Sequence, residues 1–210
     1  TSMNLAFTIA LAYPLSKRNL KGRTAINALV FFTMIFSGGM VPSFLLIRSL
    51  DLMNTRWSVI LSCLLSTYYV VLVTNFIRSL PGSLLESARL DGANDITVFW
   101  RIVLPLSKAG LATIALFYAV DKWNEWWNSM LYINRMEMYP LQLILQSIIN
   151  TYQSATDRNI ASADALNRLK TFSMGIKMAA IVVTMLPIMC VFPFLQRFFV
   201  KGIMIGAVKG

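Results

Sequence analysis

Residues 86–105 read ESARLDGANDITVFWRIVLP, a stretch whose first half is small and polar in a chain that is otherwise strongly apolar. At its start, Ser83 and Glu86 have the three-residue spacing of a capping box, which predicts a short helix beginning near Ser83. Gly92 is the residue that adopts a left-handed backbone conformation at no steric cost. The stretch therefore predicts a helix that ends in a tight corner at Gly92.

A second short helix is predicted after the corner. Asn94 or Asp95 is expected to cap its start, and Pro105 is expected to end it. Helical spacing puts four apolar side chains on one face of this second helix, namely Ile96, Phe99, Trp100 and Val103. The stretch thus predicts a helix, a corner and a helix, with one apolar face available for packing.

The composition is that of a membrane protein. Of the 210 residues, 57% are hydrophobic and 13% are charged, and the mean hydropathy is +0.63. An ordinary soluble domain is about 45–50% apolar and about 25% charged. We expect a single all-α domain over residues 1–210, built as a bundle of transmembrane helices in the lipid bilayer.

The net charge of +10 does not predict binding to nucleic acid. Lys and Arg residues occur in small groups at the ends of apolar runs, which fits anionic lipid headgroups and an acidic partner surface. The chain has no histidine, and Cys63 and Cys190 both lie inside apolar runs. We therefore expect no catalytic residue, no metal site, no cofactor and no disulfide framework.

The apolar runs predict about five spans. Residues 1–16 are shorter than the roughly 20 residues that cross a bilayer, so we expect them to be the end of a span that begins upstream of this sequence. The basic cluster that marks the cytoplasmic side consists of Lys17, Arg18, Lys21 and Arg23. The remaining spans are expected at residues 26–47, 57–77, 109–133 and 177–199. This order puts loop 78–108 and the C-terminus in the cytoplasm.

The motif in loop 78–108 resembles a known family. Glu86-x-Ala88-x-x-Asp91-Gly92-Ala93, with Phe99, Ile102 and Pro105 at their present spacing, is similar to the cytoplasmic EAA loop of permease subunits in binding-protein-dependent ABC importers. Ser87 stands where the family usually has alanine. The resemblance implies the type I importer permease fold and a loop that docks into an ATPase subunit. The residues implied in that coupling are Glu86, Ser87, Ala88, Asp91, Gly92, Ala93, Phe99, Ile102 and Pro105.

The C-terminal tail narrows the resemblance. Residues 200–210 read VKGIMIGAVKG and resemble the C-terminus of the MalG-like permease subunits of sugar importers. In that family the tail reaches the contact between the two ATPase subunits. The resemblance therefore implies ATPase-contacting roles for Lys201, Gly202, Gly206 and Lys209.

A second candidate site is the polar stripe in the expected span 109–133. Carboxylate and amide side chains recur there at helical spacing with tryptophans between them, an arrangement that suits sugar hydroxyls and the apolar faces of sugar rings. The candidate pathway residues are Asp121, Trp123, Asn124, Glu125 and Asn128. The alternative is an aromatic belt at the membrane interface, which we favour for Trp127 and Tyr132.

These features predict a transport subunit and not an enzyme. The chain contains no Gly-Lys dipeptide, so ATP must be bound by another polypeptide. The resemblance implies a carbohydrate importer in a prokaryotic cell membrane, with a sister permease, two ABC ATPase subunits and an extracytoplasmic solute-binding protein. The alternatives are a permease for a non-sugar solute and an intramembrane phosphotransferase. Catalysis by a phosphotransferase would need further aspartates at helical spacing after Asp91-Gly92-Ala93. Only Asp95 follows before the next expected span, which argues against this alternative.

Overall fold

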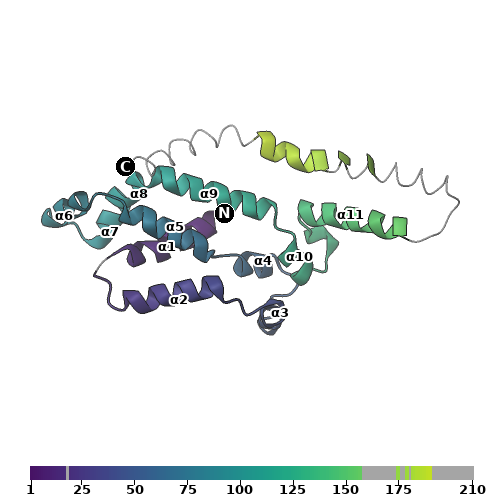
Figure 1. Ribbon diagram of the computed structural model, residues 1–210, viewed down its shortest axis with the longest axis horizontal. Coiled ribbons are helices and arrows are strands. Elements are labelled where there is room, and N and C mark those ends of the chain that lie inside the picture. The colour runs from purple at the N-terminus through teal and green to yellow at the C-terminus, as the bar shows by residue number, and fades with distance from the viewer. Residues whose placement is uncertain (18, 158–173, 176–177, 180, 191–210) are drawn as a thin grey trace. The chain divides into compact units, whose positions relative to one another are not determined.

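The computed structural model describes residues 1–17, 19–157, 174–175, 178–179 and 181–190 (Figure 1). Every regular element within these ranges is a helix, as expected from the sequence. The expected last span, residues 177–199, lies partly outside the described residues. The expected ATPase-contacting tail, residues 200–210, lies wholly outside them.

The described residues form two compact units. The first unit holds Thr1–Ser43 and Ile60–Lys122, and the second holds Phe44–Val59 and the described residues from Trp123 onward. The coupling motif lies in the first unit. Of the candidate pathway residues, Asp121 lies in the first unit and the other four lie in the second.

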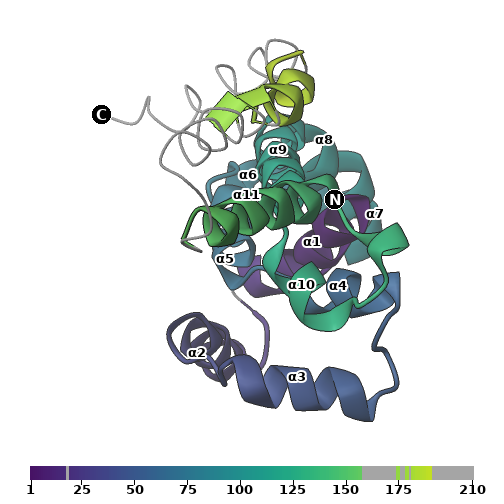
Figure 2. The ribbon, with the colours of Figure 1, turned by 90° about the vertical axis from the view of Figure 1, so that its right-hand side faces the viewer.

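The core of the first unit is built on α1 (Ser2–Ser16) and α5 (Thr67–Arg78), which lie side by side (Figures 1 and 2). Their buried apolar residues recur every three or four positions, which is the period of one helix face. α9 (Lys108–Trp123) completes the core. The core side chains of these three helices are Ile9, Ala12, Leu15, Tyr69, Val70, Val73, Ile77, Leu111, Ile114 and Tyr118.

The other helices of the first unit contribute fewer side chains to this core, which also includes Val98 and Val103 of loop 78–108. α2 (Arg23–Ile35) begins after Gly22, which has φ +77°, and none of its side chains is buried. Loop 78–108 folds into α6 (Gly82–Leu90), α7 (Asp95–Val98), a π-helical turn (Phe99–Val103) and α8 (Leu104–Leu106). These short helices are the corner that the sequence predicts.

Helix breaks divide the predicted spans. No single helix among the described residues is both long enough and apolar enough to cross a membrane. Three consecutive helix pairs have the required length and composition when each pair is taken together, but each is bent by more than 40°. They are Arg23–Ile35 with Met40–Ser49, Arg56–Ser62 with Thr67–Arg78, and Asp95–Leu106 with Lys108–Trp123. The expected spans 26–47 and 57–77 therefore each contain a break between two helices, and in the expected span 109–133 the first helix ends at Trp123.

Local chemistry accounts for two of the breaks. Between α2 and α3 (Met40–Ser49), Gly39 has φ +87°, a conformation that only glycine adopts readily and that stops a helix. Between α4 (Arg56–Ser62) and α5, Ser66 has an extended backbone and is the residue before α5 begins. These features interrupt the helical hydrogen bonds although the hydropathy stays high.

In the second unit, the turn around Asn54 is fastened to the segment that follows α10 (Trp127–Tyr132). The backbone N–H of Asn54 donates to the carbonyl of Tyr132 at 2.9 Å, and Asn134 N–H donates to Asn54 Oδ1 at 2.7 Å. The ring of Phe44 stacks on that of Tyr132 with centroids 6.4 Å apart. A 3-10 turn (Met136–Met138) then leads to α11 (Leu141–Asp157).

Candidate functional site

The corner between α6 and α7 is closed by backbone hydrogen bonds within a few residues. Gly92 has φ +80°, as predicted. Ala93 N–H donates to the carbonyl of Ala88 at 2.9 Å, and Gly92 N–H donates to that of Arg89 at 3.0 Å. These two bonds are the Schellman motif, which satisfies the free carbonyls at a helix end. The corner is therefore a hydrogen-bonded turn with a defined backbone geometry.

Asn94 caps the helix after the corner. Its Oδ1 accepts from the backbone N–H of Thr97 at 2.8 Å, which confirms the predicted cap. The predicted capping box at the start of α6 is wrong. α6 begins after Pro81 without a side-chain cap, and Ser83 instead accepts a 2.9 Å bond at its carbonyl from Ser87 Oγ. Proline already fixes the backbone angle at this entry, so the helix starts without that cap.

The predicted apolar face of the second helix is also wrong. Ile96 is 69% exposed and Trp100 is 63% exposed, whereas Val98 and Val103 are buried. The π-helical turn between Phe99 and Val103 explains the change, because its wider turn places residues five apart, and not four, on the same side. Of the two aromatic residues on the predicted face, Phe99 packs against the core and Trp100 is exposed.

Pro105 does not end the helix. It lies in the first turn of α8, where a missing backbone N–H is tolerated, and the π-helical turn directly precedes it. The break comes two residues later, at Ser107, where the chain bends by 76° before α9. Ser107 is fully buried, and its Oγ has no hydrogen-bond partner.

The residues implied in coupling divide between an outer and an inner side of the corner. Glu86, Ser87, Asp91 and Gly92 are exposed. Ala88, Ala93 and Phe99 pack against the core, and Ile102 is partly buried. Sequence reasoning missed one exposed apolar residue, Leu90, which is 89% exposed beside Asp91. Its only signal in the sequence is a leucine in an otherwise polar turn.

The C-terminal end of α1 is attached to this corner. Tyr13 Oη donates to the carbonyl of Asp95 at 2.9 Å, and Lys17 Nζ lies 2.7 Å from Asp95 Oδ2. The Lys17 ammonium holds the pKa of the Asp95 carboxyl below its usual range, chiefly through this hydrogen bond. Arg89 Nη2, from α6, lies 3.6 Å from the other carboxylate oxygen. Sequence reasoning did not detect these contacts.

The break between α4 and α5 is held by side chains from distant helices. Asn4 Nδ2 donates to the carbonyls of Cys63 and Leu64 at 2.6 and 2.8 Å. The hydroxyl of Tyr118 accepts from Ser66 N–H at 3.2 Å. Helix ends leave such groups unsatisfied, and water is not there to pair with them in a bilayer core. Polar side chains of α1 and α9 therefore complete the hydrogen bonding of this break.

The predicted polar stripe does not lie on one continuous helix. α9 ends at Trp123, and α10 begins at Trp127. Asp121 accepts a 2.7 Å hydrogen bond from the Tyr69 hydroxyl, within the first unit. In the second unit, Glu125 Oε1 accepts from Asn128 N–H at 2.8 Å and so caps α10. Asn124 is exposed, and the indole Nε1 of Trp123 is buried without a hydrogen-bond partner among the residues that the structure describes.

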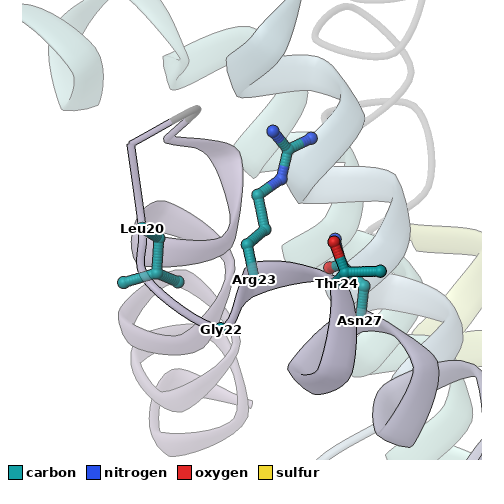
Figure 3. A pocket seen from close by; sticks show the side chains of 5 residues that line it. All are labelled: Leu20, Gly22, Arg23, Thr24 and Asn27. Atoms are coloured by element: carbon teal, nitrogen blue, oxygen red, sulfur yellow. The ribbon is translucent and has the colours of Figure 1, made fainter.

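A shallow pocket lies beside the start of α2. It is lined by Leu20, Gly22, Arg23, Thr24 and Asn27 and has a volume of about 490 Å³ (Figure 3). Figure 3 shows the Arg23 side chain extending away from the loop, while Thr24 and Asn27 lie together on the first turn of the helix. This pocket contains none of the predicted site residues.

Comparison with known proteins identifies the class. The family described as binding-protein-dependent transport system inner membrane component matches residues 5–205, and this chain belongs to it. Protein LplC of Bacillus subtilis is 45% identical over 210 residues, which cover 100% of this chain and 70% of that protein. The polygalacturonan/rhamnogalacturonan transport system permease protein YtcP of the same organism is 40% identical over 217 residues, which cover 100% of this chain and 72% of that protein.

A solved structure agrees with this assignment. The crystal structure of a bacterial ABC transporter involved in the import of the acidic polysaccharide alginate matches with a TM-score of 0.79 and 31% identity. The match covers 95% of this chain and 70% of that one. The expected importer permease fold is therefore confirmed. The protein is a transport subunit of the cell membrane and works in a system that depends on a binding protein.

Proposed function

We propose that this subunit forms part of the path by which an ABC importer moves a carbohydrate into a prokaryotic cell. The similarity to permeases that are named for polygalacturonan/rhamnogalacturonan and alginate import supports a sugar polymer or oligosaccharide as the solute. The energy comes from ATP hydrolysis on partner subunits. A sister permease, two ATPases and an extracytoplasmic binding protein complete the system.

The observation that carries the coupling role is the exposed, hydrogen-bonded corner between α6 and α7. Its outer side presents two carboxylates, Glu86 and Asp91, beside an almost fully exposed leucine, Leu90. Burying this apolar side chain against a partner subunit would contribute favourable free energy to docking. A stiff element of this kind transmits movement because it does not deform when it is pushed.

The attachment of α1 to the corner supports the proposed orientation. Lys17 belongs to the basic cluster that marks the cytoplasmic side, and it contacts Asp95 of the coupling loop. The end of α1 and the loop must therefore face the same side of the membrane. We propose a multi-pass arrangement within a single transport domain over residues 1–210, with loop 78–108 and the C-terminus in the cytoplasm.

The solute path remains a proposal. Asp121, Trp123, Asn124, Glu125 and Asn128 are its candidate residues. The helix break at 124–126 supports a path there, because interrupted helices in membrane proteins lie where they border protein or a cavity. The buried indole N–H of Trp123, for which the described residues provide no hydrogen-bond partner, is a donor suited to a sugar hydroxyl.

The proposal is tested by reconstituting the complete importer in vesicles with its binding protein. Uptake of labelled oligosaccharides is measured with ATP inside the vesicles, and uptake of non-sugar solutes is measured in parallel. We expect ATP-dependent uptake of a carbohydrate only. Selective uptake of an amino acid or an anion would replace the sugar assignment and leave the importer class intact.

A further inference from the structure

The contacts between α1 and the corner meet at one residue. Asp95 is the first residue of α7, and its backbone carbonyl and its carboxylate are both bound by α1, through Tyr13 and Lys17 at 2.9 and 2.7 Å. The Lys17 side chain is 23% exposed and that of Asp95 is 58% exposed. An isolated ion pair at such a partly exposed site contributes little to stability. The arrangement matters because several contacts fix the same residue.

Aromatic contacts surround this ion pair. The rings of Tyr13 and Phe99 have centroids 4.8 Å apart, so α1 also contacts the π-helical turn after α7. Lys17 Nζ lies 4.5 Å from the centroid of the Tyr13 ring, within the range of a cation–π interaction. Tyr13 therefore contacts both the backbone of α7 and the π-helical turn after it, and Lys17 contacts the carboxylate of Asp95.

A further hydrogen bond ties the same end of α1 to α5. Arg78 Nη2, in the last turn of α5, donates to the carbonyl of Leu15 at 2.8 Å. The chain connects the corner directly to α5 and to α9. In contrast, Tyr13 of α1 lies 82 positions before Asp95 in the sequence. The hydrogen bond and the ion pair at Asp95 therefore give a movement of the corner a direct route to α1.

We propose that Tyr13 and Lys17 are positioning residues that make α1 a third helix driven by the coupling corner, in addition to α5 and α9. This inference rests on the proposed coupling function of loop 78–108. When an ATPase moves the corner, the attachment at Asp95 carries the end of α1 with it. Without the attachment, the corner moves while α1 lags, and ATP is hydrolysed without a matching movement of the helices.

The test is a double-mutant cycle on the reconstituted importer. The variants are Lys17→Met, Asp95→Asn and both together, and the readout is the number of solute molecules imported per ATP hydrolysed. This ratio does not depend on how much complex assembles, so a purely structural loss leaves it unchanged. We expect each single variant to lower the ratio by about threefold or more, and the double variant to lower it no further than Asp95→Asn, which also removes the 3.6 Å contact with Arg89.

Two further variants sharpen the cycle. Tyr13→Phe keeps the ring contact with Phe99 and removes only the hydrogen bond to Asp95, so we expect a smaller loss than with Tyr13→Ala. Lys21→Met is the matched control: it removes an exposed lysine of the same loop for which no ion pair is seen among the described residues, and it should leave the ratio at the wild-type value.

The outcomes separate this inference from the proposed function. A normal ratio in Lys17→Met and Tyr13→Ala, together with uncoupling by Gly92→Val in the corner, would overturn the role of α1 and leave the coupling corner in place. A normal ratio in all of these variants would overturn both. Additive losses from Lys17→Met and Asp95→Asn would also overturn the proposed role of α1, because the two residues would then act separately.

Discussion

Thr8 of α1 and Tyr118 of α9, 110 positions apart in the sequence, share a buried hydrogen bond of 2.7 Å between their hydroxyl groups. The same Tyr118 oxygen accepts from the backbone N–H of Ser66 at the break before α5. One hydroxyl therefore joins three helices of the first unit. It lies where the α4–α5 pair loses its regular hydrogen bonds.

Replacing Tyr118 should weaken this junction. We expect Tyr118→Phe to destabilise the purified subunit by about 0.5–2 kcal/mol, because the Thr8 hydroxyl and the Ser66 N–H lose a partner in an apolar surrounding. Thermal unfolding of the complex in detergent measures the change. Tyr68→Phe is the control, since Tyr68 is 52% exposed and should be replaceable without effect. Equal unfolding temperatures for the two variants would show that the junction contributes nothing.

Gly92 should be the most sensitive glycine of the corner. Its φ of +80° disfavours any residue with a β-carbon by about 1–2 kcal/mol, although no atom lies within 4 Å of the position of that carbon. We expect Gly92→Ala, and more so Gly92→Val, to reduce ATPase binding in pull-down assays and binding-protein-stimulated ATP hydrolysis. Gly92→Asn should be milder, because asparagine tolerates left-handed angles.

Gly82 provides the matched control for this prediction. It lies in the same loop with equally open space around it, but it does not have a positive φ. Gly82→Ala should therefore bind the ATPase and hydrolyse ATP as the wild type does. If Gly82→Ala and Gly92→Val behaved alike, the left-handed corner would have no part in docking.

The contact between α5 and α9 should depend on the absence of a side chain at Gly110. A β-carbon there would lie 2.8–2.9 Å from three ring atoms of Phe76, closer than atoms of this kind pack. We expect Gly110→Ala to destabilise the subunit by about 1–3 kcal/mol, as overpacking usually does. Combining it with Phe76→Leu, which removes the ring, should restore part of the loss. Unfolding measurements with Gly38→Ala, a glycine in open space, are the control.

Glu125 allows capping to be separated from solute contact. Its carboxylate accepts from Asn128 N–H at the start of α10, and a glutamine oxygen can do the same. We expect Glu125→Leu to lower stability by about 0.5–2 kcal/mol and Glu125→Gln to leave it nearly unchanged. If Glu125 also contacts the solute, Glu125→Gln should assemble normally and transport less. Normal transport by Glu125→Gln would leave this residue with a capping role only.

Local sequence was sufficient to predict the corner. The Schellman bonds, the left-handed Gly92 and the Asn94 cap all join residues within five positions of one another. Interactions of such short range depend on few other parts of the chain, so residue type alone indicates them. The one local feature predicted wrongly, the capping box at Ser83, competed with a proline at the same entry, and the backbone restriction of proline prevailed.

The sequence did not predict which side chains of the second helix face the core. A regular period put Ile96, Phe99, Trp100 and Val103 on one side, but the π-helical turn changed the period, and only part of that set faces the core. Whether a helix contains a π-turn depends on how it packs and how it meets a proline such as Pro105. Apolar side chains such as Ile96 are exposed as a result.

The amino-acid sequence by itself determined the class of protein, the helical content and the coupling corner, because hydropathy, turn chemistry and the motif are properties of neighbouring residues. Only the tertiary structure decided where the predicted spans break, and which side chains satisfy each break. Asn4 and Tyr118 meet the α4–α5 break across 59 and 52 positions, and Lys17 meets Asp95 across a still longer separation. The reason is that a buried backbone group must find a partner wherever the fold brings one, and sequence distance does not limit that choice.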